Sequence, residues 1–480
     1  NMYEDIEKFC FFSKAVLSIL PLIGFKPDII HCHDWQTGLI PVYLHDSFQS
    51  DPFFWGIKTI FTIHNLKFQG TWSVDTIKGF SGLSDYYFTS DKLEAYGNGN
   101  LLKGGLVYAD RITTVSRSYA SEIRMPFYGE GLDGLLRARS KQLSGIVNGI
   151  DYNVYNPKTD KDIAVNYSVE DAIKAKAANK TALQKELGLE ENPDAFMLGI
   201  VSRLTDQKGL DLVECVLDQI CAEDVQLVVL GTGEGKYQDM FTYYSRKYPE
   251  RVSANIFYSE ALSHRIYASC DAFLMPSLFE PCGLSQLMSL RYGTLPIVRE
   301  TGGLRDTVTP YNEVDGTGTG FSFTNYNAHE MLAIIRYAKK TYFNDRKAWN
   351  EMVLRAMKQD FSWDASAREY EKLYDGLIEE EERRKEAIRL QQAREAAEAA
   401  LKEAEKALEL AKRAEEKAIR KFSGIEDEPE DEKAEISKAE EIDETPEAAP
   451  ESEEVTEVLE TPETPETPEE VSETAVEEKE

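Results

Sequence analysis

A carboxylate at residue 280 interrupts a segment that otherwise passes from a strand-like to a helix-like pattern. The segment reads PSLFEPCGLSQLMSL over residues 276–290, with Glu280 directly before Pro281 and Gly283 two residues further on. The apolar run before it and the amphipathic run after it predict a strand-to-helix junction. Two interpretations remain open: a carboxylate that binds a ligand at the sheet edge, or an acid that favours a helix N-terminus.

Two positively charged residues follow another apolar run that predicts a buried strand. In FMLGIVSRLTDQKGLDLV, Arg203 and Lys208 flank a predicted turn between a strand and a helix. Arg offers a bidentate fork and Lys a point charge, so the pair could close on a single anion. The alternative is that both are solvated loop charges, which is the ordinary state of Arg and Lys.

Glycine-rich turns follow two further strand-like runs. They are GTGEG at 231–235 and TGGL at 301–304, the second of which includes Thr301, Gly302 and Gly303. Such turns let backbone N–H groups approach a phosphate, although any tight strand-to-helix turn can need a glycine. Neither turn is a GxGxxG fingerprint, and the sequence has no GxxxxGK[ST] motif, which disfavours the dinucleotide-binding and P-loop classes.

Histidines mark the ends of two early strand-like runs. His31-Cys32-His33-Asp34 looks like a metal cluster, but alternate residues of a strand face opposite sides, so Cys32 points away from both histidines. No further Cys or His stands at zinc spacing, and we expect no metal here. Asp34 and His64, each at the end of a predicted strand, are the better functional candidates.

The elements that position these residues alternate between strands and helices. Buried strands are predicted for DIIHCHD, KTIFTIHN, RITTVS, FMLGIVSR, VQLVVLGTG, DAFLMPS and TLPIVRE. Buried strands that alternate with helices indicate parallel sheets in an α/β fold, whose ligands bind at the carboxyl ends of the strands. Residues 152–194 lack a convincing strand but predict a helix that ends at Gly188, which favours a passage between two α/β domains.

Composition narrows the class of protein. The 480 residues are 42% hydrophobic, enough for a sizeable core, and the net charge is −31. Residues 425–480 hold 25 Asp and Glu against 3 Lys, so the first 424 residues carry only −9. The sequence lacks the concentrated basic face that a nucleic-acid-binding protein needs. No apolar run reaches the ~20 residues that span a membrane. Six scattered cysteines without a CxxC pair fit a cytoplasmic protein with reduced thiols.

The C-terminal part differs in character. Residues 379–424 predict one charged helix with a weak heptad seam that Arg394 and Glu415 interrupt. Two interpretations of this segment remain open: a charged helix surrounded by solvent, or a helix that associates weakly as a coiled coil. Residues 425–480, rich in TPE units and acids, predict a disordered tail.

Taken together, the motifs resemble those of the bacterial glycogen synthases and the related plant starch synthases. They occur in the family's order over residues 1 to about 375. The set is HCHDWQTGLIP, FTIHNLKFQG, YADRITTVS, GIVNGIDYNVYNP, VSRLTDQKGLDLV, YSEALSHRIYASCDAFLMPSLFEPCGLSQLMSLRYGTLPIVRETGGLRDTV and GTGF. The resemblance implies the GT-B arrangement of two Rossmann-like domains around a cleft, over 1–153 and 154–362. A helix over 363–378 would return to the first domain.

The resemblance also implies an activity and roles for individual residues. Glucose would pass from ADP-glucose to the non-reducing end of an α-1,4-glucan such as glycogen, with retention of configuration and without a cofactor or metal. Arg203 and Lys208 would neutralise the diphosphate, and Glu280 would hold the sugar with the backbone of Cys282, Gly283 and Leu284. Tyr258 would stack on adenine, and Thr301, Gly302 and Gly303 would bind phosphate. His64, Asn65, Asp34 and Asn148 would face the transferred glucose from the cleft.

Two departures bear on this resemblance. Met288 stands where many retaining GT-B transferases have a second Glu, which fits the glycogen and starch synthase group. The family's opening Lys-x-Gly-Gly-Leu loop is missing, since Lys103-Gly104-Gly105-Leu106 matches a different family segment, so we expect the first domain to be incomplete at its N-terminus. Two alternative functions remain: another retaining GT-B transferase and a non-catalytic interaction protein. If the source is a plant, the expected location is the plastid instead of the cytoplasm.

Overall fold

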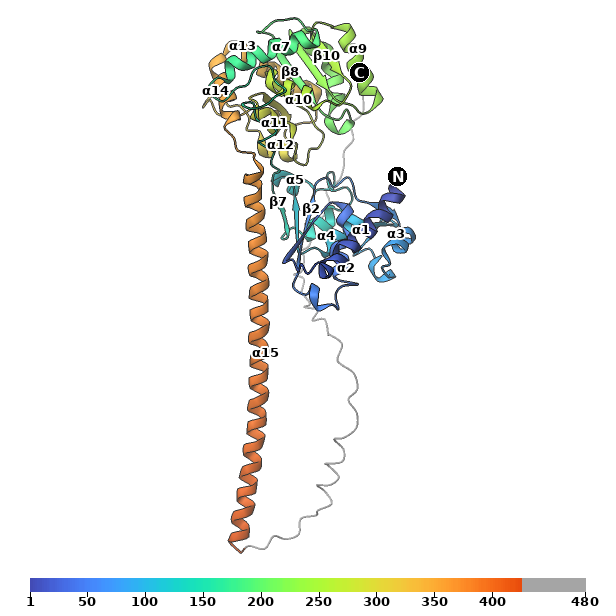
Figure 1. Ribbon diagram of the computed structural model, residues 1–480, viewed down its shortest axis with the longest axis vertical. Helices are drawn as coiled ribbons and strands as arrows, with labels where there is room; N and C mark the ends of the chain where they lie inside the picture. Colours follow the sequence, from blue (N-terminus) through green and yellow to red (C-terminus); the bar gives the residue numbers. More distant parts are fainter. Residues whose placement is uncertain (425–480) are drawn as a thin grey trace, which may run out of the picture. The chain divides into compact units, whose positions relative to one another are not determined.

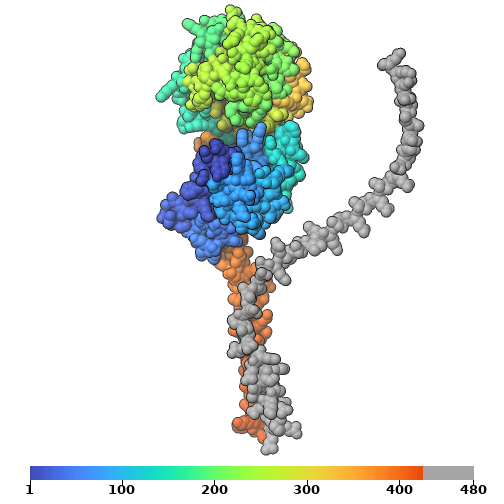
Figure 2. All heavy atoms as spheres, turned by 90° about the vertical axis from the view of Figure 1, so that its right-hand side faces the viewer, coloured from blue at the N-terminus to red at the C-terminus, as the bar shows by residue number. Residues whose placement is uncertain are grey.

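The computed structural model describes residues 1–424, which belong to two compact units. The first unit is residues 1–389, and the second begins at Leu390. Within the first unit, two α/β halves form adjoining lobes (Figures 1 and 2). The predicted disordered tail, residues 425–480, lies outside the described residues.

The first half is built on a four-stranded parallel sheet in the order β1-β2-β6-β7. Its strands are β1 (Ile29–His33), β2 (Lys58–Ile63), β6 (Arg111–Thr114) and β7 (Leu143–Gly145). The helices of this half are α1 (Met2–Leu22), α2 (Leu39–Leu44), α3 (Val74–Ser81), α4 (Leu101–Tyr108), α5 (Arg117–Glu122) and α6 (Asp133–Ala138). A small antiparallel sheet combines β3 (Thr71–Ser73), β4 (Glu94–Ala95) and β5 (Asn98–Asn100).

The second half is built on a six-stranded parallel sheet in the order β10-β9-β8-β11-β12-β13. Its strands are β8 (Phe196–Val201), β9 (Val225–Leu230), β10 (Val252–Asn255), β11 (Ala272–Met275), β12 (Leu295–Arg299) and β13 (Phe321–Phe323). The helices are α7 (Ala172–Leu187), α8 (Leu210–Ala222), α9 (Gly235–Lys247), α10 (Glu260–Ser269), α11 (Ser285–Arg291), α12 (Gly302–Thr307), α13 (Ala328–Asn344) and α14 (Arg346–Met357).

All seven predicted strands are present. Every residue of β9 and β11 is buried, as expected for parallel strands covered by helices on both faces. The predicted helix before Gly188 is α7, and Gly188 ends it in the left-handed conformation. The sequence patterns missed β7, β10 and β13 and the three strands of the small antiparallel sheet, β3, β4 and β5, which are two to four residues long, because so short a run carries little periodicity.

The chain crosses between the two halves twice, and the crossings lie side by side. Ile150 donates its N–H to the carbonyl of Phe361 at 2.8 Å, and a parallel bridge joins Ile150 to Ser362. A Cβ on Gly149 would lie 2.5 Å from the Cα of Trp363, so this close approach requires glycine. The two halves are therefore linked through a narrow pair of segments.

Helix α15 (Trp363–Phe422) starts at this crossing and continues without a break through both helices that the sequence predicts for 363–378 and 379–424 (Figure 1). Its first turns return to the first half, as the resemblance implies. The Tyr374 hydroxyl lies 2.8 Å from Nδ1 of His31 on β1, and Ser366 donates to the carbonyl of Val147. None of the helices in residues 1–424 is long and apolar enough to cross a membrane.

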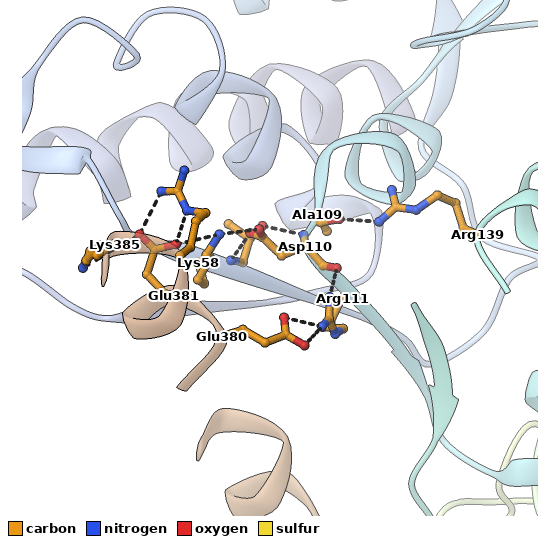
Figure 3. Close-up of polar contacts among 10 residues, drawn as sticks. Lys58, Ala109, Asp110, Arg111, Arg139, Glu380, Glu381 and Lys385 are labelled. Atoms are coloured by element: carbon orange, nitrogen blue, oxygen red, sulfur yellow. Dashed lines mark hydrogen bonds and ion pairs between the residues drawn. The ribbon is translucent and has the colours of Figure 1, made fainter. Parts of the chain in front are cut away.

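A charged cluster fixes α15 to the edge of the first sheet where β2 and β6 begin (Figure 3). Glu381, only 5% exposed, lies 3.2 Å from Nζ of Lys58 and 2.8 Å from the Arg384 guanidinium. Lys58 also pairs with Asp110, which precedes β6, and Glu380 binds the guanidinium of Arg111 with both oxygens. The bond from Arg384, helped by Lys58, lowers the pKa of the Glu381 carboxyl to about 2.

We predict that Glu381→Gln lowers the free energy of unfolding by about 1–2 kcal/mol at pH 7, because it removes a buried carboxylate from Lys58, Arg384 and Lys385, the last of which lies 3.8 Å away. The folded pKa of Glu381 lies below its ordinary value of 4.5, so its contribution is present above pH 4.5 and is lost as the pH falls toward 2. Urea unfolding as a function of pH measures this difference.

Glu379→Gln is the matched control, since Glu379 is 66% exposed and its one ion pair within residues 1–424 is with Arg383, one turn away. We expect this control to change stability by less than about 0.5 kcal/mol. An equal effect of the two variants, or a Glu381→Gln effect that persists at pH 2, would contradict the assignment.

Candidate active site

A pocket of about 340 Å³ lies where residues of both halves meet at the carboxyl ends of the strands. The first half contributes residues that follow β2, β6 and β7, and the second half contributes residues that follow β8 and β11. The lining residues are His64, Asn65, Val115, Asn148, Ser202, Arg203, Gln207, Lys208, Met275, Glu280, Pro281, Cys282, Gly283, Leu284 and Ser285.

Glu280 and Lys208 form the charged centre of this pocket. Nζ of Lys208 donates to Oε2 of Glu280 at 2.6 Å, and Ser277 donates its hydroxyl to the same oxygen at 3.0 Å. Glu280 is 6% exposed, so its carboxylate is buried against a cation rather than solvated at a helix end. Because α11 begins only at Ser285, the simple helix N-terminal interpretation of this acid is wrong.

Arg203 lies in the same pocket but differs from Lys208 in its exposure and its contacts. Its side chain is exposed, and within residues 1–424 its guanidinium forms no hydrogen bond or ion pair. Lys208 stands at the end of a short 3-10 helix, Asp206–Lys208, that Gly209 terminates in the left-handed conformation. The two cations therefore share one pocket, with only Lys208 neutralised by a carboxylate.

The loop of Glu280 packs tightly against the start of α12. Gly303 donates its N–H to the carbonyl of Glu280 at 3.0 Å, and a Cβ on Gly302 would lie 2.0 Å from that same oxygen. Gly302, with φ of +46°, thus allows an approach that no other residue permits. Gly283 (φ +71°) allows the following turn of the loop.

Thr301, Gly302 and Gly303 do not line the pocket, contrary to the predicted phosphate-binding turn. All three are buried, and their N–H groups have other acceptors. Gly302 N–H donates to Oε1 of Glu122 at 2.9 Å, and the Thr301 hydroxyl donates to the same carboxylate at 3.2 Å. The sequence prediction placed this turn correctly in the fold, but the turn supports the Glu280 loop.

Glu122 belongs to a reciprocal contact between α5 of the first half and α12 of the second. Asp306, on α12, accepts hydrogen bonds from the N–H and the hydroxyl of Ser118 at 2.9 and 2.6 Å. Each short helix thus supplies an acid to the N-terminus of the other, where helix N–H groups lack partners. Ser116 adds a bond to the carbonyl of Pro281 at 2.6 Å, so the first half directly braces the Glu280 loop.

On the first half, three histidines and Asp34 form one network. His31 and His33 stack at 4.3 Å between ring centroids, on the same face of β1, while Cys32 is fully buried on the other. His33 Nδ1 lies 3.0 Å from Nε2 of His64, the histidine that lines the pocket. Burial lowers the pKa of His31 to about 4 and also lowers that of His33, so both are neutral at pH 7.

Asp34 acts behind the pocket rather than in its wall. Its carboxylate accepts the backbone N–H of His64 at 2.8 Å, and burial raises the pKa of this carboxyl while that bond opposes the change. Asp34 therefore fixes the turn after β2. Tyr258, the predicted adenine partner, follows β10 at the edge of the sheet, is 85% exposed and does not line the pocket.

One further group has metal-ligand chemistry. Oxygens of Asp160 and Asp162 and a ring nitrogen of His264 lie within 4.8 Å of one another. Asp160, however, already accepts hydrogen bonds from His264 Nδ1 at 2.7 Å and from the Tyr292 hydroxyl at 2.5 Å. Asp160, His264 and Tyr292 are buried and bind one another, which fits a structural role, and they do not line the pocket.

Comparisons with known proteins identify relatives of this chain. Residues 1–138 match the family model of the starch synthase catalytic domain, and residues 181–353 match that of group 1 glycosyl transferases. A glycogen synthase of Lachnospira eligens is 69% identical over 376 residues, covering 78% of this chain and 79% of that protein. A glycogen synthase of Desulforamulus reducens is 52% identical over 375 residues, covering 78% of each chain.

The chain belongs to the glycogen and starch synthase family of glycosyltransferases. A solved structure supports this: the catalytic domain of starch synthase IV from Arabidopsis thaliana, bound to ADP and acarbose, matches with a TM-score of 0.73 and 35% identity over 78% of both chains. A sucrose-phosphate synthase from Thermosynechococcus elongatus, with a TM-score of 0.51 and 18% identity, shares the fold. The GT-B fold expected from the sequence is thereby confirmed.

In this family member, nine of the predicted site residues line the pocket, whereas the residues that hold them in place were not predicted: the nine are His64, Asn65, Asn148, Arg203, Lys208, Glu280, Cys282, Gly283 and Leu284. His33, Ser277 and Glu122 each contact a predicted residue or its backbone, and Asp306 adds the second bond pair between α5 and α12 through Ser118. The alternation of HCHD could have indicated His33, since it shares a face with His31. Nothing in the sequence signals Glu122, whose partner is 180 residues away.

We predict that Glu122→Ala lowers the free energy of unfolding by about 1–3 kcal/mol, because it leaves the Gly302 N–H and the Thr301 hydroxyl buried without an acceptor. Glu122→Gln retains an acceptor oxygen and should cost less than half as much. Denaturant unfolding of the two variants measures this. Equal losses for Ala and Gln would show that the charge, and not the hydrogen bonds, maintains the contact between α5 and α12.

Proposed function

We propose that this glycosyltransferase moves glucose from ADP-glucose to the non-reducing end of an α-1,4-glucan, with retention of configuration. The observation that carries the proposal is the Lys208–Glu280 pair beside Arg203 in one pocket. The pocket thus offers two cations for a diphosphate and one buried carboxylate for sugar hydroxyls. Family membership and the ligands of the Arabidopsis structure, ADP and acarbose, support this choice of substrates.

The diphosphate of the donor would bind to Arg203 and Lys208. The Arg203 guanidinium makes no competing ion pair among residues 1–424, so its fork can take two phosphate oxygens. Lys208 already faces Glu280 at 2.6 Å, so one ammonium group can contact the leaving phosphate and the sugar-binding acid together. Fixed cations that stabilise the departing ADP remove the need for a divalent metal.

Glu280 would accept hydrogen bonds from the hydroxyls of the transferred glucose, while the backbone of Cys282, Gly283 and Leu284 borders the same pocket. A carboxylate buried at 6% exposure holds its orientation because Lys208 and Ser277 bind one oxygen. His64 and Asn148 would contact the sugar from the first half, with His33 and Asp34 fixing His64 from behind. Tyr258 would stack on adenine.

The transfer would break the bond between the anomeric carbon and the β-phosphate oxygen and form a bond from that carbon to the acceptor O4 on the same face. The proton of the acceptor hydroxyl would pass to the departing phosphate oxygen, so that charge is balanced. At the position eight residues after Glu280, Met288 packs against the apolar core of the second half. We infer from this that the phosphate, rather than a second carboxylate, receives the proton.

The protein would work with reduced thiols, as in the cytoplasm. All six cysteines are unpaired in residues 1–424, and burial raises the pKa of Cys282, beside the pocket, to about 12. Cys282 is therefore an unreactive thiol that contributes its backbone to the pocket wall.

The test is release of ADP from ADP-glucose with glycogen as acceptor. We expect transfer from ADP-glucose, strong competition by ADP and weak competition by UDP. Glu280→Ala should lower kcat/KM by at least about 100-fold, the scale of losing a preorganised charged contact in the transition state. Glu214→Ala, an exposed acid on α8 outside the pocket, is the matched control and should leave kcat/KM unchanged.

Each alternative predicts a different result. Preference for another nucleotide sugar, with the same loss in Glu280→Ala, would identify a different retaining transferase. Absence of both transfer and ADP binding would contradict the proposal and favour an interaction protein.

A further inference from the structure

Residues 390–422 of α15 present a row of large apolar side chains to solvent. Leu390 is 63% exposed, Leu401 61%, Leu408 57% and Phe422 98%. The polar contacts of this segment are pairs one turn apart, Gln391–Glu395, Arg394–Glu398 and Arg413–Glu409. Exposed leucines in a regular row on a helix mark a face that another helix can cover.

The row follows the heptad period of a coiled coil. One set of positions, seven residues apart, holds Arg394, Leu401, Leu408, Glu415 and Phe422. A second set, three residues further along, holds alanine at each heptad: Ala397, Ala404, Ala411 and Ala418, with Leu390 at its start. Both sets lie on one stripe of the helix, which is the spacing that two supercoiled helices need.

We propose that residues 390–422 bind a second copy of this chain as an antiparallel two-helix coiled coil. Aligning Leu390 with Phe422 of the partner subunit covers the whole segment. In this register Leu401 faces Ala411 of the partner subunit, and Leu408 faces Ala404 of the partner subunit. In the middle of the segment each leucine therefore meets an alanine, which is the complementarity that close packing requires, whereas at the two ends Leu390 faces Phe422 of the partner subunit.

Charge decides the direction of the pairing. In the antiparallel register, Arg394 lies three residues, about 4.5 Å along the axis, from Glu415 of the partner subunit, within reach of an ion pair. A parallel pair would place Arg394 against its own copy and Glu415 against its own copy, and both contacts repel. The two residues that interrupt the apolar seam are thus complementary only when the helices run in opposite directions.

The helix positions on either side of the two heptad sets predict a pairing that is close but weak. Alanine occupies the flanking position of four successive heptads, at Ala393, Ala400, Ala407 and Ala414, which lets two helices approach closely. On the other flank, Glu405 lies near its own copy at the twofold axis, which opposes association. We therefore expect a dimer that dissociates on dilution.

Sedimentation equilibrium of the full chain over a range of concentrations tests the pairing. We expect the mass to rise from 54.4 kDa toward twice that value, and Leu401→Glu with Leu408→Glu to weaken the dimer by at least about tenfold. Circular dichroism verifies that the helix is retained in each variant. A mass of one chain at every concentration, with the helix intact, overturns the proposal.

A charge exchange tests the direction. Arg394→Glu and Glu415→Arg should each weaken the dimer about fivefold or more, whereas the double variant should restore it, because opposite charges face each other again. Arg413→Glu, outside both heptad sets, is the matched control for net charge. A parallel dimer would respond little to any of the three seam variants, and a mass above two chains would also contradict the antiparallel pair.

Discussion

The contact between Lys208 and Glu280 is the interaction on which the pocket depends. An acid 6% exposed would be costly to ionise without a cation, and Lys208 supplies one at 2.6 Å. The two residues come from different strand ends of one sheet, after β8 and after β11, which are neighbours in the sheet order. Parallel pairing of these strands therefore brings the charges together, and the apolar core beneath them maintains the distance.

The Glu280 loop is in turn supported from the other half of the molecule. Ser116 binds the carbonyl of Pro281, and Glu122 binds the start of α12, whose Gly303 holds the carbonyl of Glu280. A change in the contact between α5 and α12 would thus reach the Glu280 carboxylate through the backbone. The two halves are joined through bonds such as these and through the paired crossings near Ile150 and Phe361, so the geometry of the pocket is a property of both halves.

Much of this could be predicted from the sequence because it is local. Long apolar runs gave the seven main strands, and polar residues at their ends gave Glu280, Arg203, Lys208 and His64. What could not be predicted depends on tertiary contacts. Gly302 and Gly303 were expected to leave their N–H groups to a phosphate, but a carboxylate from residue 122 and the carbonyl of residue 280 take them. Asp34 likewise holds the His64 backbone because β1 and β2 are paired, which no local pattern reveals.

Titration calorimetry with ADP tests the central claim most directly, namely that Lys208 serves the diphosphate while Glu280 serves the sugar. We expect Lys208→Met to weaken ADP binding by about tenfold or more, since it removes a charge-assisted contact. Glu280→Gln should keep ADP binding within about twofold of the unaltered chain, or strengthen it, because the acid contacts the sugar that ADP lacks. Equal losses in both variants, or unchanged binding in Lys208→Met, would contradict this division of roles.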